Sequence, residues 1–261
     1  MLEAFHIAAA GMNAQQTQVD VISNNLANVN TTGFKKSKVD FEDLMYRQLQ
    51  SASGPLGAVG GEQTNPVGMG TSISAIAKVF TQGEVKNTER PLDLAIEGAG
   101  FLEVLLPDGT YAYTRTGNLQ IDRDGMIINS DGYLLSPSVQ VPSDTESLLF
   151  KPDGMVMAKV VGEDDPIEIG QLQLANFINA AGLTPVGDNL YIPSHQSGDA
   201  FYSTPGEDGT GLLAQGFLEG SNVNLVEELT NLILAQRGYE LNSKAIQAAD
   251  DMLGIVNNMR R

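Results

Sequence analysis

Two repeats of apolar residues at opposite ends of the chain constrain its fold more than any other feature. At the N-terminal end two series recur every seven residues, the second three places after the first: Phe5, Met12, Val19 and Leu26, then Ala8, Gln15, Ile22 and Val29. This spacing is typical of the a and d positions of a coiled-coil helix. The helix should end near Asn30, because Gly33 tolerates the left-handed backbone that follows many helices.

The C-terminal end carries a second repeat with the same spacing. Its two series are Leu225, Leu232, Tyr239, Ile246 and Leu253, then Ala235, Asn242, Ala249 and Val256. We predict a helix from about residue 224 to residue 258. Its remaining faces carry charged side chains, namely Glu227, Glu228, Arg237, Glu240, Lys244, Asp250 and Asp251. This helix therefore has a side that water can solvate.

The N-terminal helix lacks such a side. Asp20 is the only formally charged residue between Phe5 and Phe34, whereas a solvated helix normally carries charge on its outer face. One interpretation is a helical hairpin within a single domain, in which the two repeats cover each other. The other is that copies of the same chain supply the missing walls, because two helices alone leave much of this surface wet. Repeated head-to-tail contacts of that kind give a helical array.

Between the two repeats the sequence is typical of antiparallel β structure. From about residue 73 to residue 200 apolar and polar residues alternate, and Asp-Gly pairs begin at Asp108, Asp124, Asp131 and Asp153. Such pairs between alternating runs favour hairpin turns. We therefore predict an α+β fold, with long N- and C-terminal helices forming a coiled-coil-like pair and a mostly antiparallel β middle domain.

The predicted organisation has five parts. The Gly-, Ser- and Pro-rich stretch of residues 51–70 shows no period and predicts a linker or extended loop. The parts are the N-terminal helix of a core domain at 1–33, a linker and extended loop at 34–72, a β-rich middle domain at 73–200, a return linker at 201–223 and the C-terminal helix of the core domain at 224–261.

Composition excludes several classes of function. The net charge of −17 and the pI near 4.3 oppose binding to nucleic acid, because the phosphate backbone would repel such a surface. The absence of cysteine excludes disulfides and thiolate metal sites. No segment reaches the ~20 apolar residues that span a bilayer. Glu3 stands where a secretory signal has basic residues, so we expect that any export proceeds without a cleaved signal peptide.

The sequence offers no arrangement that requires an enzyme. The tetrapeptide Asp-Arg-Asp-Gly at 122–125 resembles the start of a calcium loop, but Met126 and Tyr133 occupy positions that need oxygen ligands. His6 and His195 are the only histidines, and no Gly-x-Ser-x-Gly elbow accompanies them. We therefore predict no catalytic, cofactor-binding or metal site, and a hairpin turn at Asp122.

Both terminal repeats lie within longer motifs that resemble a known family. Bacterial flagellar axial proteins, the rod and hook subunits, carry paired terminal signatures similar to two stretches here: AAAGMNAQQTQVDVISNNLANVNTTGFKKS and EGSNVNLVEELTNLILAQRGYELNSKAIQAADDML. Two internal stretches extend the resemblance over nearly the whole chain: DLAIEGAGFLEVLLPDGTYAYTRTGNLQIDRDG and GQLQLANFINAAGLTPVGDNLYIPSHQSGDAFYSTPGEDGTGLLAQGFLEGSNVN. Hook subunits are longer and carry outer domains, whereas this chain has room for one modest β domain. The resemblance therefore favours a rod subunit, and among these the distal rod.

The resemblance implies a structural subunit rather than an enzyme. Such a subunit of the flagellar distal rod, the drive shaft, polymerises into a hollow tube that transmits torque and encloses the export channel. The alternatives are a proximal rod or short hook-like axial subunit and, from a different class, a secreted β domain that binds or acts on carbohydrate.

The resemblance also implies partners and a location. The expected partners are further copies of the chain in a helical homopolymer, proximal rod subunits, the hook protein, the surrounding basal-body ring proteins and the flagellar type III export apparatus, with no nucleic acid. The expected location is the periplasm-spanning rod of the flagellar basal body, reached by type III export without a cleaved signal peptide. No cofactor is implied.

The repeats and the resemblance together predict an assembly interface on the two helices. It comprises Phe5, Met12, Val19, Ile22, Asn24, Asn25, Leu26, Ala27, Asn28, Leu225, Leu232, Tyr239, Ile246 and Leu253.

Overall fold

The chain folds into two compact units. The computed structural model describes residues 2–49, 65–162 and 165–259. A helical unit comprises Met1–Leu26, Ser37–Ala77 and Leu225–Arg261, and a β unit comprises Ala27–Lys36 and Lys78–Asn224. Most of the loop predicted at 51–70 falls on residues 51–64, which lie outside the described residues.

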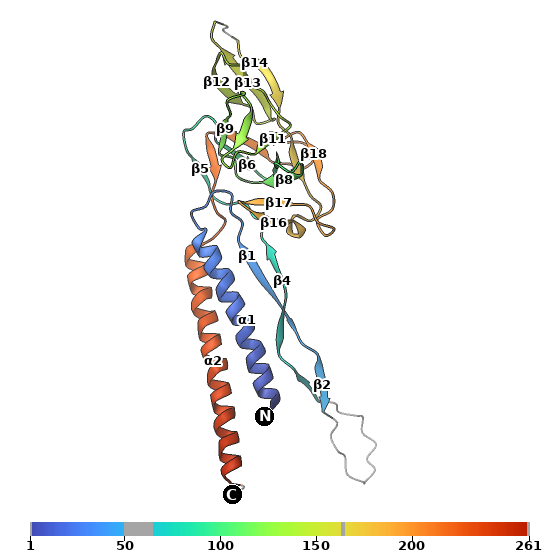
Figure 1. Ribbon diagram of the computed structural model, residues 1–261, viewed down its shortest axis with the longest axis vertical. Helices are drawn as coiled ribbons and strands as arrows, with labels where there is room; N and C mark the ends of the chain where they lie inside the picture. Colours follow the sequence, from blue (N-terminus) through green and yellow to red (C-terminus); the bar gives the residue numbers. More distant parts are fainter. Residues whose placement is uncertain (1, 50–64, 163–164, 260–261) are drawn as a thin grey trace. The chain divides into compact units, whose positions relative to one another are not determined.

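The helical unit contains two long helices, α1 (Leu2–Ala27) and α2 (Leu225–Asn258), which lie side by side (Figure 1). The first helix ends three residues earlier than predicted, because residues 28–30 form a turn in which Thr31 N donates to Asn28 O at 3.2 Å. Gly33 follows with a φ of 69°, the left-handed conformation that glycine adopts without strain. The second helix continues unbroken through Gly238. The two predicted helices are thus confirmed.

Two short ladders belong to the same unit. The first joins β1 (Ser37–Asp43) to β4 (Thr71–Lys78), and the second joins β2 (Tyr46–Leu49) antiparallel to β3 (Asn65–Gly68). Strands therefore occupy part of the segment 34–72, for which the sequence predicts a linker. The paired strands are separated in the sequence by residues of the Gly-, Ser- and Pro-rich segment, which has no hydrophobic period. No local sequence pattern therefore indicates that they pair.

The β unit is built around a seven-stranded sheet with the order β16-β17-β8-β7-β11-β10-β9. A three-stranded sheet, β12-β13-β14, and the ladders β15-β18, β19-β6 and β20-β5 complete it. The pairings are antiparallel, which confirms the predicted β middle. A 3-10 turn, η1 (Ala180–Gly182), precedes β16. The strands are β5 (Val85–Asn87), β6 (Leu94–Glu97), β7 (Leu102–Leu105), β8 (Tyr111–Thr114), β9 (Leu119–Ile121), β10 (Ile127–Asn129), β11 (Leu134–Ser136), β12 (Thr145–Phe150), β13 (Met155–Val160), β14 (Ile167–Gln171), β15 (Leu174–Asn176), β16 (Thr184–Gly187), β17 (Leu190–Ile192), β18 (Phe201–Ser203), β19 (Leu212–Gln215) and β20 (Phe217–Glu219).

Four hairpins of this unit turn at the predicted Asp-Gly pairs. In each, the glycine N–H donates to the carbonyl two residues before the Asp, at 3.0 or 3.1 Å. The four glycines have φ values between 76° and 87°. These are three-residue loops in which only the glycine needs the left-handed conformation. The segment that resembles a calcium loop, residues 122–125, is one of them and joins β9 to β10.

The predicted return linker, residues 201–223, also contains strands. β18 pairs with β15, β19 with β6 and β20 with β5, so this segment forms part of the β unit. Each strand has only three or four residues, and its partner lies far away in sequence. The alternation over such short lengths is too weak to distinguish a strand from a loop.

Candidate assembly interface

A buried polar contact joins the last turns of α1 to the first turns of α2. Asn25 is 1% exposed, and its Nδ2 donates to Glu228 Oε2 at 3.3 Å and to Ser37 O at 2.9 Å. Its Oδ1 accepts a hydrogen bond from Ser37 N at 2.9 Å. A single amide side chain therefore holds α1 against both the start of β1 and the start of α2.

Glu228 corrects one prediction, because the sequence assigns it to a solvated face and it is buried. It belongs instead to a series spaced by sevens that continues through the buried Ala235 and Ala249. Asn242 lies between these two alanines in the same series, and its side chain lies next to Gly11 of α1. The side chains of this series on α2 are thus small or polar.

Small residues allow the two helices to approach closely. A Cβ placed on Gly11 would lie 2.7 Å from Asn242 Nδ2, and one placed on Gly238 would lie 3.2 Å from Gln15 Cδ. Gln15 lies ten residues before Asn25, and its neighbour Gly238 lies ten residues after Glu228. Gly11 and Asn242 are likewise each fourteen residues from that pair. The helices therefore run antiparallel in one constant register.

The predicted interface residues divide into two groups. Ile22 and Asn25 are buried within the single chain, whereas Leu225 and Tyr239 are 47% and 43% exposed. Asn24 and Ala27 are exposed, and the half-buried members are Phe5, Met12, Val19, Leu26, Asn28, Leu232, Ile246 and Leu253. The large apolar side chains therefore flank the contact between α1 and α2 and do not fill it.

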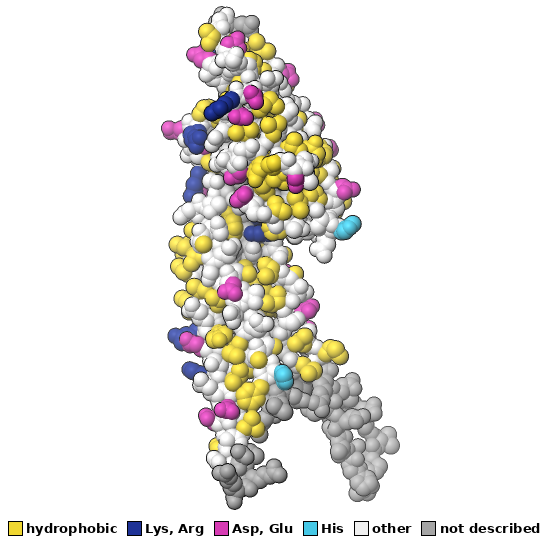
Figure 2. Space-filling model, in the orientation of Figure 1, with side chains coloured by type: hydrophobic (Ala, Val, Ile, Leu, Met, Phe, Trp, Pro, Cys, Tyr) yellow, Lys and Arg dark blue, Asp and Glu magenta, His cyan; other side chains and the backbone are white. Residues whose placement is uncertain are grey.

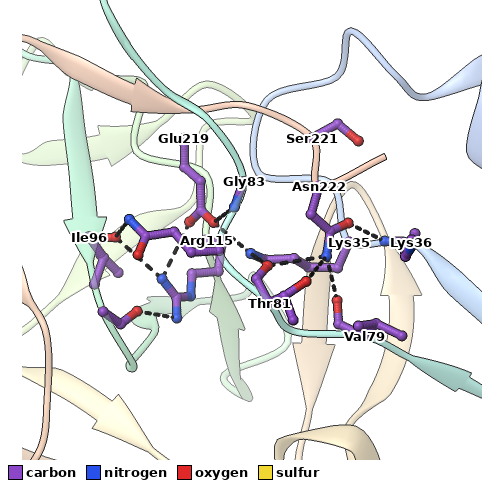
Figure 3. Close-up of polar contacts among 12 residues, drawn as sticks. Lys35, Lys36, Val79, Thr81, Gly83, Ile96, Arg115, Glu219, Ser221 and Asn222 are labelled. Carbon is purple, nitrogen blue, oxygen red and sulfur yellow. Dashed lines mark hydrogen bonds and ion pairs between the residues drawn. The ribbon is translucent and has the colours of Figure 1, made fainter. Parts of the chain in front are cut away.

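The β unit contains a buried ion network of Lys35, Arg115 and Glu219, the last residue of β20 (Figure 3). Glu219 Oε1 accepts from Lys35 Nζ at 2.6 Å, and Glu219 Oε2 lies 3.3 Å from Arg115 Nη1. The ammonium also donates to Thr81 O at 2.8 Å, and Gly83 N donates to Glu219 Oε1 at 2.8 Å. The three charged side chains are between 0% and 3% exposed.

One carboxylate therefore faces two cations in this network. Burial lowers the pKa of Lys35, and the hydrogen bond to Glu219 together with its charge opposes that shift. Burial likewise lowers the pKa of Arg115, and the same carboxylate opposes it. Removing one partner from a buried ion pair costs about 3 to 5 kcal/mol, because the other charge stays desolvated.

Asn222 ties the same segments together through the backbone. Its Oδ1 accepts from Lys36 N at 2.7 Å, and its Nδ2 donates to Val79 O at 2.7 Å and to Thr81 O at 3.1 Å. With the ion network, it fixes residues 35–36, 79–83 and 219–222 to one another (Figure 3). We call this group, with Lys35, Arg115, Glu219 and Asn222 as its side chains, the junction.

Sequence reasoning missed the junction. Its residues are single lysine, arginine, glutamate and asparagine positions without a spacing rule that implies contact. The one available signal is that Lys35, Glu219 and Asn222 fall inside the two terminal motifs, GFKKS and EGSNVN, which the family resemblance singles out.

Among residues 2–49, 65–162 and 165–259, no group of three or more His, Asp or Glu side chains could hold one metal ion. Of the helices described, none is long and apolar enough to cross a membrane.

Family comparisons match three successive parts of the chain. Residues 5–35 match the flagella basal body rod protein family, and residues 95–158 match the D1 domain of the flagellar hook protein FlgE/F/G. Residues 214–259 match the C-terminal part of the flagellar basal body rod FlgEFG proteins. The first and last matches contain nearly all of α1, all of α2 and three of the four junction side chains.

Individual relatives match over the full length. The chain is 46% identical to the flagellar basal-body rod protein FlgG of Borreliella burgdorferi, with 100% of both chains covered. It is 42% identical to the FlgG of Caulobacter vibrioides, over 99% of this chain and 100% of that protein. It is 40% identical to the FlgG of Bacillus subtilis, again with 100% of both chains covered.

Proposed function

The chain belongs to the family of flagellar basal-body rod proteins, and from this premise we propose how it builds the rod. It is a structural subunit of the flagellar distal rod. We propose that α1 and α2 form a coiled-coil-like pair and that this pair is the polymerising part of the subunit. The subunits then form a hollow tube that transmits torque and encloses the export channel, and the chain catalyses no reaction.

The exposure of large apolar side chains on the helices is the observation that supports this proposal. Leu225 and Tyr239 leave nearly half of their surface in water, and Leu241 leaves 66%. Contiguous exposed apolar surface in a protein generally marks a site of interaction. We propose that the exposed and half-buried members of the predicted interface on both helices complete their burial against other copies of the chain.

The charged face of α2 supports an arrangement within the tube. Arg237, Glu240, Lys244 and Asp251 are exposed, and burying an unpaired charge is very costly. We propose that this face lines the water-filled channel, while the nearly uncharged α1 lies between α2 and neighbouring subunits.

We further propose the partners and the route. The tube contacts proximal rod subunits at one end and the hook protein at the other, and basal-body ring proteins surround it. The chain reaches the periplasm through the flagellar type III export apparatus without a cleaved signal peptide. The support for these partners and for this route is membership of the rod family.

Two tyrosines of similar exposure provide the test. Tyr239 lies on α2 and is 43% exposed, whereas Tyr111 lies on β8 and is 51% exposed. Each is replaced by glutamate in a chain that is the only copy in the bacterium. The measurements are swimming and the presence of the subunit in isolated basal bodies.

Tyr239→Glu should abolish both swimming and incorporation, because a carboxylate cannot be buried between helices without a partner. Tyr111→Glu should retain incorporation. Normal rods with Tyr239→Glu would show that the helices are not the polymerising part. Absence of the unaltered chain from isolated rods would overturn the assignment to the rod itself.

A further inference from the structure

The second helix carries a row of uncharged residues beside the series that contacts α1, and one member of this row, Gly238, also lies close to Gln15 of α1. Six of its members are exposed: Leu234, Leu241, Ala245, Ala248, Met252 and Ile255. With Gly238 included, the spacing along the row alternates strictly between four and three residues. We call these seven residues the α2 stripe.

The exposure of the α2 stripe is large for apolar side chains. Leu234, Leu241, Met252 and Ile255 are 64%, 66%, 51% and 60% exposed, and Figure 2 shows hydrophobic side chains at the surface of the helical unit. An alternation of four and three residues is the repeat that another helix fills with its own side chains. The α2 stripe is therefore shaped for a helix.

The first helix carries a matching row. Phe5, Met12, Val19 and Leu26 are half-buried and alternate with the exposed Ala9, Gln16 and Ser23. The spacing again alternates between four and three residues, and no member is charged. We call these seven residues the α1 stripe.

The two stripes cannot cover each other within one chain. At 3.6 residues per turn, each stripe is turned by about 100° from the line through which its helix contacts the other. The line on α1 passes through Gly11 and Gln15, and the line on α2 passes through Ala235 and Asn242. Viewed from the start of each helix, the α1 stripe is rotated from its contact line in the direction in which the chain winds, and the α2 stripe is rotated in the reverse direction. Because the two helices run antiparallel, the stripes therefore face opposite sides of the helix pair.

We propose that the α2 stripe of one subunit binds the α1 stripe of the next. The inference rests on the proposed polymerisation through the helices and names the surfaces that carry it. Such a contact is heterologous, because each subunit offers one stripe to each of two neighbours, and its repetition builds an open or ring-like array.

The dimensions and shapes of the stripes agree with this pairing. Each stripe covers an equal length of chain, 5–26 on α1 and 234–255 on α2, which is about 32 Å of helix. The α1 stripe alternates large apolar residues with small or uncharged ones. The α2 stripe offers small residues at Gly238, Ala245 and Ala248 among large ones. Both stripes therefore combine large side chains with small ones, as interdigitating helices do.

Charge selects a second copy over other occupants. The α1 stripe is uncharged, and Asp20 is the only charged residue on α1 beyond Glu3, so this helix can be enclosed without burying a charge. An anionic membrane surface, the usual alternative for an exposed apolar helix face, would be repelled by a chain of net charge −17.

Disulfide cross-linking tests the pairing directly, because the chain contains no cysteine. One cysteine replaces Leu241, and a second replaces Ala9, Gln16 or Ser23 in three separate variants. These three positions are spaced by sevens, so one of them lies within about 5 Å of Leu241 along the helix axis in every register that places Leu241 opposite the span from Ala9 to Ser23. Isolated rods of each variant are oxidised and separated under denaturing, non-reducing conditions.

We expect a ladder of dimers and higher multimers from at least one of the three variants. The matched control pairs each of the same three positions with a cysteine at the exposed Gln247, which lies about 120° around the helix from Leu241, and it should give monomers only. No ladder from any Leu241 variant, or equal ladders from the Gln247 set, would overturn the pairing. Rods that assemble normally without these cross-links would leave the proposed function intact while refuting the stripes.

A substitution pair gives an independent readout. Leu241→Glu and Gln247→Glu each add one carboxylate to an exposed position of α2. Leu241→Glu should reduce the amount of subunit in isolated rods at least tenfold, whereas Gln247→Glu should leave it within twofold. Helix content of the purified monomers, measured by circular dichroism, should be the same for both. Equal incorporation of the two variants would count against the α2 stripe as a contact surface.

Discussion

The β unit and the helical unit bury different kinds of side chain. In the β unit large apolar residues are almost inaccessible, with Leu94, Leu102, Leu119 and Ile127 at 0% or 1% exposure. The helical unit buries mainly alanines, Ile22, Val39 and a polar pair, Asn25 and Glu228, while most of its larger side chains are half-buried or exposed. Apolar burial stabilises by roughly 25 cal/mol per Å². The β unit therefore has a core of its own, and the helical unit has a contact without one.

This difference indicates which part of the subunit is complete before assembly. Fixing the backbone of one residue costs about 1 to 2 kcal/mol, and alanines at a helix contact return little of that cost. The aromatic cluster of the β unit, by comparison, packs Phe101, Tyr113, Phe177 and Tyr191 edge to face. We expect the β unit to be stable alone and the helical unit to gain its stability in the polymer.

Amide hydrogen exchange of dilute monomer should show the largest effect. Amides of α1 and α2 should exchange at least about a thousand times faster than those of β7 and β8, because local opening needs far less free energy than global unfolding. The measurement is exchange followed by mass spectrometry, with the assembled rod as the comparison. Equally slow exchange in the monomer would support a stable hairpin within one chain.

The sequence predicted the elements whose signal is local. The helices follow from seven-residue spacing, and the hairpins follow from Asp-Gly pairs such as Asp108-Gly109, since a three-residue loop needs only that glycine. The short strands β18, β19 and β20 could not be predicted, because their partners are distant in sequence.

The site shows the same limit. The repeats identify the apolar faces of the helices. They do not indicate which of the two series on each helix makes the contact between α1 and α2. The sequence places Glu228 on the wrong face because a charge in a helix usually marks its solvated side, whereas here the side chain is buried and accepts a hydrogen bond from Asn25. The junction depends on Lys35, Arg115 and Glu219, which are distant in sequence and share no pattern.

Glu219→Gln should give the next largest effect. The substitution keeps the shape of the side chain but leaves Lys35 and Arg115 buried without a counter-charge, so the free energy of unfolding of the β unit should fall by about 3 to 5 kcal/mol. Urea denaturation followed by tyrosine fluorescence measures it. The control is Glu84→Gln, whose exposed ion pair with Lys86 should be worth at most about 1 kcal/mol. Similar losses from both variants would mean that the buried network contributes little.

Alkaline pH should weaken the β unit selectively. Burial raises the pKa of Tyr191 from 10.0 to about 12, and burial also raises the pKa of Tyr113. The unfolded chain ionises near pH 10 while the folded one does not, so stability is unaffected below pH 10 and is lost as the pH rises toward 12. For Tyr191 the loss is about 2 to 3 kcal/mol.

Tyr191→Phe should remove that share of the alkaline loss while Tyr113 keeps the remainder. The measurement is the free energy of unfolding in urea at pH 9, 10 and 11. Identical pH dependence in Tyr191→Phe and the unaltered chain would show that the phenol of Tyr191 ionises without unfolding the unit.

The smallest effects should come from three glycines of the helices, and they test how closely α1 and α2 approach. Replacing a helical glycine by alanine stabilises the helix by about 1 kcal/mol when nothing opposes the new methyl group. At Gly254 no atom lies within 4 Å of the added Cβ, so Gly254→Ala should show this full gain.

At Gly238 the Cβ would lie 3.2 Å from the flexible end of Gln15, so Gly238→Ala should show a smaller gain. At Gly11 it would lie 2.7 Å from Asn242, which must move, so Gly11→Ala should show no gain or a loss. Thermal melting of monomer helicity, followed by circular dichroism, gives the order. Three equal gains would mean that the helices separate in the monomer, and the contact between them would then belong to the assembled rod alone.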